Sequence, residues 1–211
     1  IKSMMVELNV YESIFNNSLT GSIIITDAQN LIAKLELNGT ERISFKLSTP
    51  GTSGKRGVVD ASVETGHPFH IYKITDRRQI NQGSLVYTLH FGSREFMRNL
   101  RTKVSQAYSG TYDEMVNAIM YDKDLLDTRK KVFFQKTRNQ DKVVVPNRRP
   151  FSAISMMCKR ALAENSKSAG YYFWETTKGF HFRSWESLCV QATGRKRKSV
   201  ATFRYMPMNI T

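Results

Sequence analysis

The strongest constraint on the fold is an alternation of apolar and polar residues that recurs through the first 92 residues. Val6, Leu8 and Val10 alternate with Glu7 and Asn9, which is typical of a strand with one buried face. Similar alternation, or a short β-branched run, predicts further strands near residues 22–27, 31–38, 43–47, 69–75 and 84–92. Repeated short strands separated by turns favour a barrel or a sandwich.

The segments between these strands carry turn signals. Asn38-Gly39 predicts a hairpin, because both residues tolerate positive φ angles. Thr49–Gly57 is polar and rich in Gly, Ser and Pro, so we expect a loop there. Asn81–Gly83 is expected to join the last two strands of this part.

The spacing of the apolar residues changes from a strand period to a helix period after Gly92. Ser93 is a good N-cap for a helix whose apolar stripe would be Phe96, Leu100, Val104 and Ala107, ending at Ser109-Gly110. Thr111-x-x-Glu114 is a capping-box pattern that predicts a second helix. A short strand is expected near 132–135, and a third helix is expected after Pro150.

Two aromatic segments follow the third helix. Tyr171–Glu175 and Phe180–Ser184 predict a hairpin, and Val200–Tyr205 predicts a further strand. We therefore expect an α+β fold with two domains. Residues 1–92 would form an antiparallel β domain, and residues 93–211 would form an α+β domain with a helix and an aromatic hairpin.

Positive charge is concentrated in the distal part. The chain has a net charge of +14, but residues 1–92 contribute only 9 Lys and Arg against 8 Asp and Glu. Residues 93–211 contribute 23 against 10. Such a field favours an anionic partner, either nucleic acid or an acidic protein surface. The densest run is Arg195, Lys196, Arg197 and Lys198, which is either a solvated loop or a candidate interface.

Patterns that would indicate catalysis or a cofactor are weak. Gly51–Gly57 lacks the Gly spacing, the Ser/Thr and the helix of a phosphate-binding loop. His67 and His70 are three residues apart but have no third or fourth ligand nearby in the sequence. Cys158 and Cys189 belong to no CxxC motif, and we interpret them as small buried residues. The sequence does not decide whether the two form a disulfide with each other. We therefore expect no enzyme activity, no cofactor and no metal.

The aromatic hairpin raises a nucleic-acid hypothesis, because aromatic side chains next to Lys178 and Arg183 could stack on bases. Aromatic residues, however, fall on both faces of the hairpin, which is typical of a hairpin buried on both sides. We therefore favour burial. A basic nucleic-acid-binding or assembly module stays an alternative function, and a degradative enzyme is a weaker one. No apolar run is long enough to span a membrane.

One ordered series of motifs resembles a known family. The series begins with a Gly and a strand that ends in an Asp turn, within Leu19–Asp27. A second strand begins at Asn30–Ile32, and a Gly-x-Glu-x-Ile-x-Phe motif follows within Leu37–Phe45. That series resembles the opening barrel of baseplate or tail hub proteins of contractile-tailed phages. The order of Pro150-Phe151-x-x-Ile154, a helix and then Tyr171–Glu175 is similar to the second domain of these hubs.

This resemblance implies an N-terminal antiparallel β-barrel of tail-tube type. It also implies a structural virion protein in the tail baseplate, assembled as a homotrimer in the host cytoplasm. The hub would connect the tail tube and baseplate proteins to the central spike, and DNA would pass through its lumen without specific binding. Hubs have a second barrel, which we would expect downstream of the α+β domain, so the sequence could be incomplete.

Overall fold

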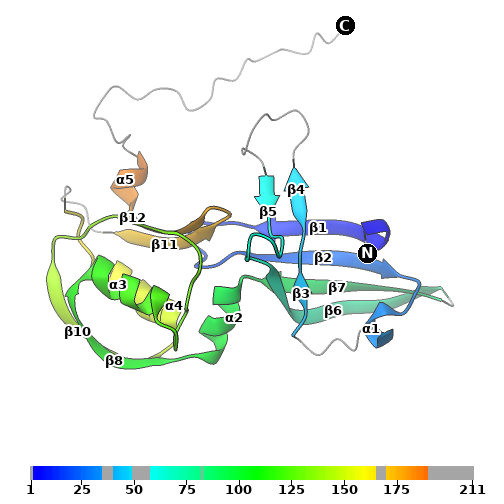
Figure 1. Cartoon of the computed structure of the whole chain (residues 1–211), viewed down its shortest axis with the longest axis horizontal. Helices are drawn as coiled ribbons and strands as arrows, with labels where there is room; N and C mark the ends of the chain where they lie inside the picture. The colour runs from blue at the N-terminus through cyan, green and yellow to red at the C-terminus, as the bar shows by residue number, and fades with distance from the viewer. Residues whose placement is uncertain (1, 35–39, 49–57, 82, 165–169, 190–211) are drawn as a thin grey trace, which may run out of the picture.

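The computed structural model describes residues 2–34, 40–48, 58–81, 83–164 and 170–189 (Figure 1). Its elements mix strands with a few short helices, which confirms the α+β class. In chain order they are η1 (Lys2–Met4), β1 (Met5–Tyr11), β2 (Thr20–Asp27), α1 (Leu31–Lys34), β3 (Arg42–Ile43), β4 (Lys46–Ser48), β5 (Val58–Asp60), β6 (Phe69–Asn81), β7 (Ser84–Gly92), α2 (Arg94–Arg101), β8 (Val104–Thr111), α3 (Tyr112–Tyr121), β9 (Val132–Phe134), β10 (Gln140–Arg148), α4 (Pro150–Cys158), β11 (Tyr171–Thr176), β12 (Gly179–Ser184) and α5 (Trp185–Cys189).

A curled antiparallel sheet organises the first part of the chain. Its strand order is β1-β2-β7-β6-β3, and the segment from β3 to β4 crosses in front of the sheet (Figure 1). The alternate residues Ile23 and Ile25 of β2 face the same core as Leu89 and Phe91 of β7. Phe45, between β3 and β4, stacks on Phe69 at a ring distance of 5.6 Å. The sheet is thus a half-barrel with the crossing segment over its apolar face; the tail-tube type of barrel stays a prediction.

The strand expected at residues 31–38 is wrong for its first four residues. Leu31–Lys34 form the single helical turn α1. The Asp27 carboxylate accepts hydrogen bonds from the backbone N–H groups of Gln29 at 2.9 Å and Leu31 at 2.6 Å, and Asn30 adopts a positive φ of 56°. This local capping overrides the alternation. Residues 35–39, including the expected Asn38-Gly39 hairpin, and 49–57 lie outside the described residues.

The helix predicted from Phe96 to Ala107 is also wrong in its second half. Ser93 caps α2 as expected, accepting a hydrogen bond from the Phe96 N–H at 3.3 Å. The helix ends at Arg101, however, and Val104–Thr111 form β8, which pairs antiparallel with β10. Neither β8 nor β10 was predicted as a strand.

Two helices and a small sheet form the second core. The capping box predicted at the start of α3 is confirmed, since the Thr111 N–H donates to the Glu114 carboxylate at 3.0 Å. The predicted short strand is confirmed as β9, and the predicted hairpin as β11–β12, with the order β11-β12-β9. The third predicted helix is confirmed as α4, which lies against β11 and α3 and ends at Cys158.

The two apolar cores share no residue. One core comprises buried residues between Leu19 and Phe91, and the other comprises buried residues between Val104 and Phe182. Helix α2 lies between the two parts in Figure 1. The boundary at 92/93 stays a prediction. Among the described residues, no helix has the length and apolar character needed to cross a membrane.

Candidate assembly interface

The five-stranded sheet has two open edges among the described residues. On one side β1 pairs only with β2. On the other side β3 pairs with β6 only through Arg42↔His70 and Ile43↔Phe69, and the Ile71 N–H reaches the Glu41 carbonyl at 3.1 Å. The outer edge of β6 beyond Ile71 therefore meets no described strand. Open edges present unpaired backbone donors and acceptors that can pair with another chain.

Large apolar side chains are exposed on both edge strands. On β1, Val6 is 65% exposed and Tyr11 is 51% exposed. On β6, Ile74 is 37% and Ile80 is 58% exposed. Exposed apolar residues gathered along an unpaired strand are typical of an interaction surface, whereas scattered ones are not. Each edge therefore offers both backbone hydrogen bonds and apolar area to a partner.

The two edges differ in charge. The charged residue on β1 is Glu7. On β6 three exposed cations, Lys73, Arg77 and Arg78, accompany one acid, Asp76. None of these cations forms an ion pair with a described residue. Opposite signs favour the pairing of unlike edges and disfavour the pairing of like edges.

Strand β6 is irregular where its edge is open. Its register with β7 shifts between Ile71 and Lys73, between Thr75 and Arg78, and again near Asn81. Asp76 adopts a positive φ of 54° at the second shift. Bulges bend and twist an edge strand, which limits indiscriminate pairing. A partner for this edge must therefore match a particular curvature.

A buried ion cluster fixes the second part of the chain to the sheet. Lys130 lies 3.2 Å from Glu95 on α2 and forms a second ion pair with Glu175 on β11. Side-chain exposure is 12% for Lys130, 2% for Glu95 and 0% for Glu175. Glu175 also accepts the backbone N–H of Leu19 at 2.8 Å, and Glu95 accepts the Thr128 hydroxyl at 2.7 Å.

The protonation of this cluster follows from burial. Burial alone would lower the pKa of Lys130, but Glu175 and Glu95 outweigh it, so the pKa is raised and the amine is charged. Burial raises the pKa of Glu175, Glu95 raises it further, and Lys130 opposes both. The Lys130 ammonium thus forms ion pairs with two carboxylates. Sequence reasoning missed this cluster; the one available signal was Glu175, an acid within an apolar aromatic strand.

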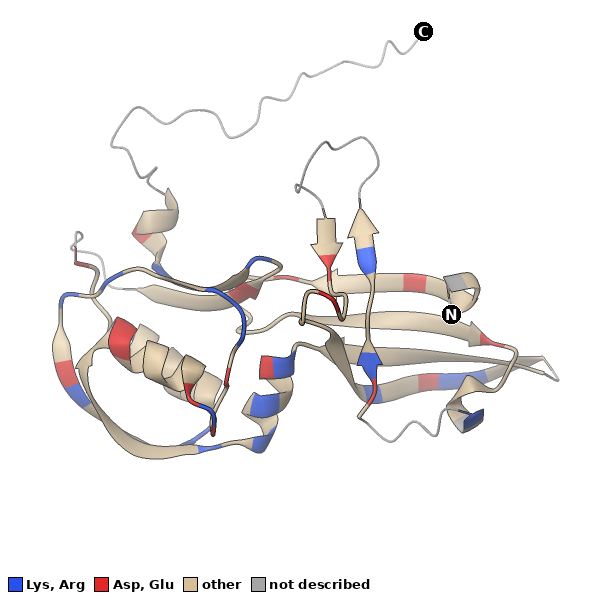
Figure 2. Cartoon of the chain, in the orientation of Figure 1, with Lys and Arg blue, Asp and Glu red and all other residues tan. Residues whose placement is uncertain are grey.

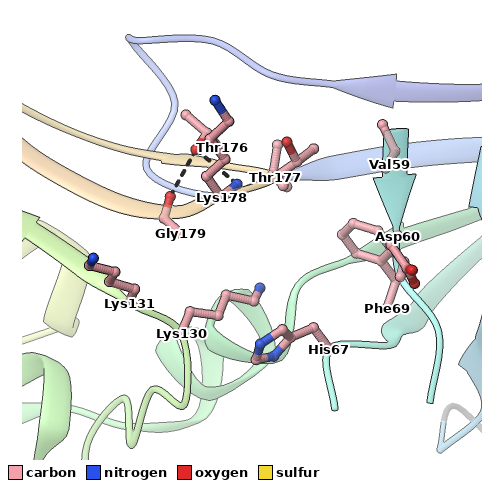
Figure 3. Close-up of a pocket in the computed structure, with 12 residues that line it drawn as sticks. Val59, Asp60, His67, Phe69, Lys130, Lys131, Thr176, Thr177, Lys178 and Gly179 are labelled. Carbon is pink, nitrogen blue, oxygen red and sulfur yellow. Dashed lines mark hydrogen bonds between the residues drawn. The ribbon is translucent and has the colours of Figure 1, made fainter. Parts of the chain in front are cut away.

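A small cavity of about 70 Å³ lies beside the cluster. Figure 3 shows Lys130 and His67 at its lower side, with Thr176–Gly179 from the β11–β12 turn opposite. Ligand sites for small molecules are typically several hundred Å³ or more. The cavity therefore suits water or an ion rather than an organic substrate.

The histidines singled out in the sequence lie apart. His67 lines the small cavity, whereas His70 lies on β6 opposite Arg42. Burial lowers the pKa of both imidazoles, and neighbouring cations lower it further. The described residues contain no group of three or more His, Cys, Asp or Glu side chains that could hold a metal ion. The candidate interface residues Arg195, Lys196, Arg197 and Lys198 lie outside the described residues.

The aromatic hairpin is buried rather than displayed. Tyr171, Phe173 and Trp174 of β11 and Phe180 and Phe182 of β12 are each less than 9% exposed. Phe173 and Phe180 stack at a ring distance of 5.5 Å with an interplanar angle of 7°. All of these rings except Trp174 belong to the second core, and all are buried, so they present no stacking platform for bases. Of the cysteines, Cys158 is buried as expected, whereas Cys189 is exposed; both are free.

Comparisons with known proteins find a similarity at the level of the fold. The sequence matches no protein-family model, and no curated protein matches it. The fold is similar to that of the 43 kDa tail protein of prophage MuSo2 from Shewanella oneidensis, with a TM-score of 0.53 and 8% identity. The match covers 83% of this chain and 48% of that protein, so this chain spans about half the length of the tail protein.

Proposed function

We propose that this chain is a structural, non-catalytic subunit of a phage tail. In this proposal three copies form a baseplate hub that joins the tail tube to the central spike and surrounds the DNA channel. The observation that carries the proposal is the fold shared with the MuSo2 tail protein over 83% of this chain. The hub motifs around Leu19–Phe45 give the finer role. The partners would be tail tube, baseplate and spike proteins of the virion.

The sheet edges supply a physical route to such a ring. If β1 of one subunit pairs with the open part of β6 of the next, each subunit uses two different surfaces. Contacts of this head-to-tail kind close into a ring when the rotation between subunits permits it. The Glu7 edge would then meet the cationic edge of β6, and the exposed apolar residues of both strands would be buried.

Mass photometry of the purified chain tests this proposal. We expect a trimer, and Val6→Lys and Ile80→Lys should each abolish it. A lysine on an exposed edge blocks strand pairing at little cost to the fold. The matched control is Val144→Lys, because Val144 lies on β10 and is 71% exposed.

An unmodified chain that stays monomeric, both alone and with its tail neighbours, would contradict the assembly role. A trimer that forms equally well in the edge variants and in the Val144→Lys control would contradict the strand-pairing interface. It would leave the hub role standing with its interface on another surface.

A second candidate function is a basic nucleic-acid-binding or assembly module. It is favoured by the uncompensated charge of the second part, where described residues 93–189 include 17 Lys and Arg against 10 Asp and Glu. Figure 2 shows these cations on α2, on the segment before β9 and along β10. Such a module would bind DNA tightly with an affinity that falls steeply as salt rises, whereas a hub subunit would bind weakly.

A further inference from the structure

A second pocket lies over the outward face of α4. Its volume is about 530 Å³. Ser152, Ser155 and Lys159 fall at i, i+3 and i+7 on that helix, so they share one face. Arg148 from the end of β10 and Arg160 from just beyond the helix complete the cationic rim. Three segments of the chain thus bring basic and hydroxyl groups to one hollow.

Two of the three cations of this pocket are available to a ligand. Neither Arg148, Lys159 nor Arg160 forms an ion pair among the described residues, and no acidic residue lines the pocket. Arg160, however, hydrogen-bonds Tyr112 and helps to lower the pKa of Asp141, which is lowered most by the hydrogen bond from Tyr112. Arg160 is thus partly compensated, whereas Arg148 and Lys159 are exposed and unpaired.

Hydroxyl donors point to a ligand with oxygen acceptors. Asn17 donates its side-chain amide to the Ser155 oxygen at 3.2 Å. The Ser155 oxygen is therefore an acceptor in that bond, and its own proton is left to donate. Ser152 makes no hydrogen bond to another described residue and is exposed. Guanidinium groups and hydroxyls together match carboxylate oxygens in planar, bidentate geometry.

We propose that this pocket docks an acidic segment of a partner protein, with Asp or Glu carboxylates seated between Arg148, Lys159 and Arg160. The size of the pocket favours this occupant over duplex DNA, since it admits a few side chains but not the broad convex surface of a duplex. A second copy is disfavoured at this cationic pocket because each chain carries a net charge of +14, whereas the proposed contact between sheet edges pairs opposite charges. The partially apolar lining, from Phe151 and Met156, suits an acidic segment that also carries an apolar residue.

Fluorescence anisotropy on the full chain tests the pocket. The probes are a labelled oligo-glutamate peptide and a labelled DNA duplex of equal charge. The test variant is Arg148→Glu/Lys159→Glu. Its control is Lys123→Glu/Arg129→Glu, which makes the same charge change at two exposed positions outside the pocket. We expect peptide affinity to fall at least about tenfold in the test variant, the loss of one good charge-assisted contact, and much less in the control.

Three results would overturn the proposal: no peptide binding by the unmodified chain, equal losses in both variants, or pocket-dependent DNA binding tighter than peptide binding. A second variant, Ser152→Glu, places an acid inside the pocket at an exposed helix position and must also weaken peptide binding. It covers the case in which the double variant does not fold. Mass photometry of the same proteins separates this result from failure of the hub role, since the pocket variants should keep the unmodified stoichiometry.

Discussion

Glu175, on the aromatic strand β11, accepts the backbone N–H of Leu19 just before β2, at 2.8 Å. The two residues are 156 positions apart, and each lies at the margin of a different core. The same carboxylate is paired with Lys130, which also neutralises Glu95 on α2. A single buried ammonium, through Glu175, thus links the backbone just before β2 to α2 and β11 in the second part.

We predict that Lys130→Met strongly destabilises the chain. It would leave two buried carboxylates without their cation, and breaking a buried pair in this way costs about 3–5 kcal/mol. The measurement is the free energy of unfolding from urea titration followed by circular dichroism. The control is Lys131→Met, because Lys131 is exposed and its ammonium only lies 4.9 Å from the Phe133 ring centroid. That exposed cation–π contact is worth roughly 0.5–1 kcal/mol, and equal losses would show that the cluster is not what stabilises this junction.

Acidification should destabilise the fold through His181. This imidazole lies between Phe133 and Trp174, with ring distances of 4.7 and 4.9 Å. Burial, together with smaller contributions from Arg183 and Lys178, lowers its pKa to about 4. A depressed folded-state pKa means that the stabilisation is present above the unfolded value of 6.5 and is lost as pH falls toward 4.

The pH dependence can be assigned with one substitution. His67 and His70 also have lowered pKa values, so they contribute to the pH dependence of stability with the same sign. The test is therefore a comparison of the pH dependence of a variant with that of the unmodified chain. The unfolding free energy of His181→Gln should fall less between pH 6.5 and 4 than that of the unmodified chain. Parallel curves for the two proteins would mean that His181 does not titrate abnormally.

Local patterns predicted the strands whose partners are close in sequence. β6 and β7 form a hairpin, as do β11 and β12, and their alternation is enforced by a neighbour a few residues away. The prediction that Val104 lies on a helix is wrong for a physical reason. Val104 is four and eight residues from Leu100 and Phe96, and positions four and eight apart share a face on a strand and also, roughly, on a helix. Only pairing with β10, about 40 residues later, decides between the two.

The candidate interface was less predictable than the fold. The sequence located the strands that carry the open edges, but which strands end up outermost depends on the order β1-β2-β7-β6-β3. The ion cluster joins residues 35 and 45 positions from Lys130, and no periodicity links lone charges at such distances. The pocket over α4 needs Asn17 beside Ser155, a contact of the same long-range kind.

The two cysteines should differ sharply in reactivity. Cys158 is buried on α4, and burial raises the pKa of its thiol to about 12. Cys189 is exposed at the end of α5. The thiolate is the reactive form, so a thiol reagent such as DTNB should modify one cysteine quickly in the native chain and the second only on unfolding. Cys189→Ser should remove the fast phase, and a fast phase that persists in that variant would show that Cys158 is accessible.

Gly21→Ala should disturb the sheet where β1, β2 and β7 meet. Gly21 lies opposite Val10 on β1 and Phe91 on β7. A Cβ there would lie 2.3 Å from the Asn9 carbonyl oxygen and 2.4 Å from the Phe91 ring. Because one of these neighbours is backbone in a paired strand, the strand must shift. Overpacking of this kind costs about 1–3 kcal/mol.

Thermal and urea unfolding of Gly21→Ala measures that cost, and Gly83→Ala is its matched control. A Cβ at Gly83 meets no atom within 4 Å, so this variant should differ from the unmodified chain by less than about 0.5 kcal/mol, as surface substitutions usually do. Because the clash moves β1, the outer edge of the sheet, Gly21→Ala should also weaken the trimer under conditions where the monomer is still folded. Full assembly by a destabilised Gly21→Ala chain would show that β1 is not part of the interface.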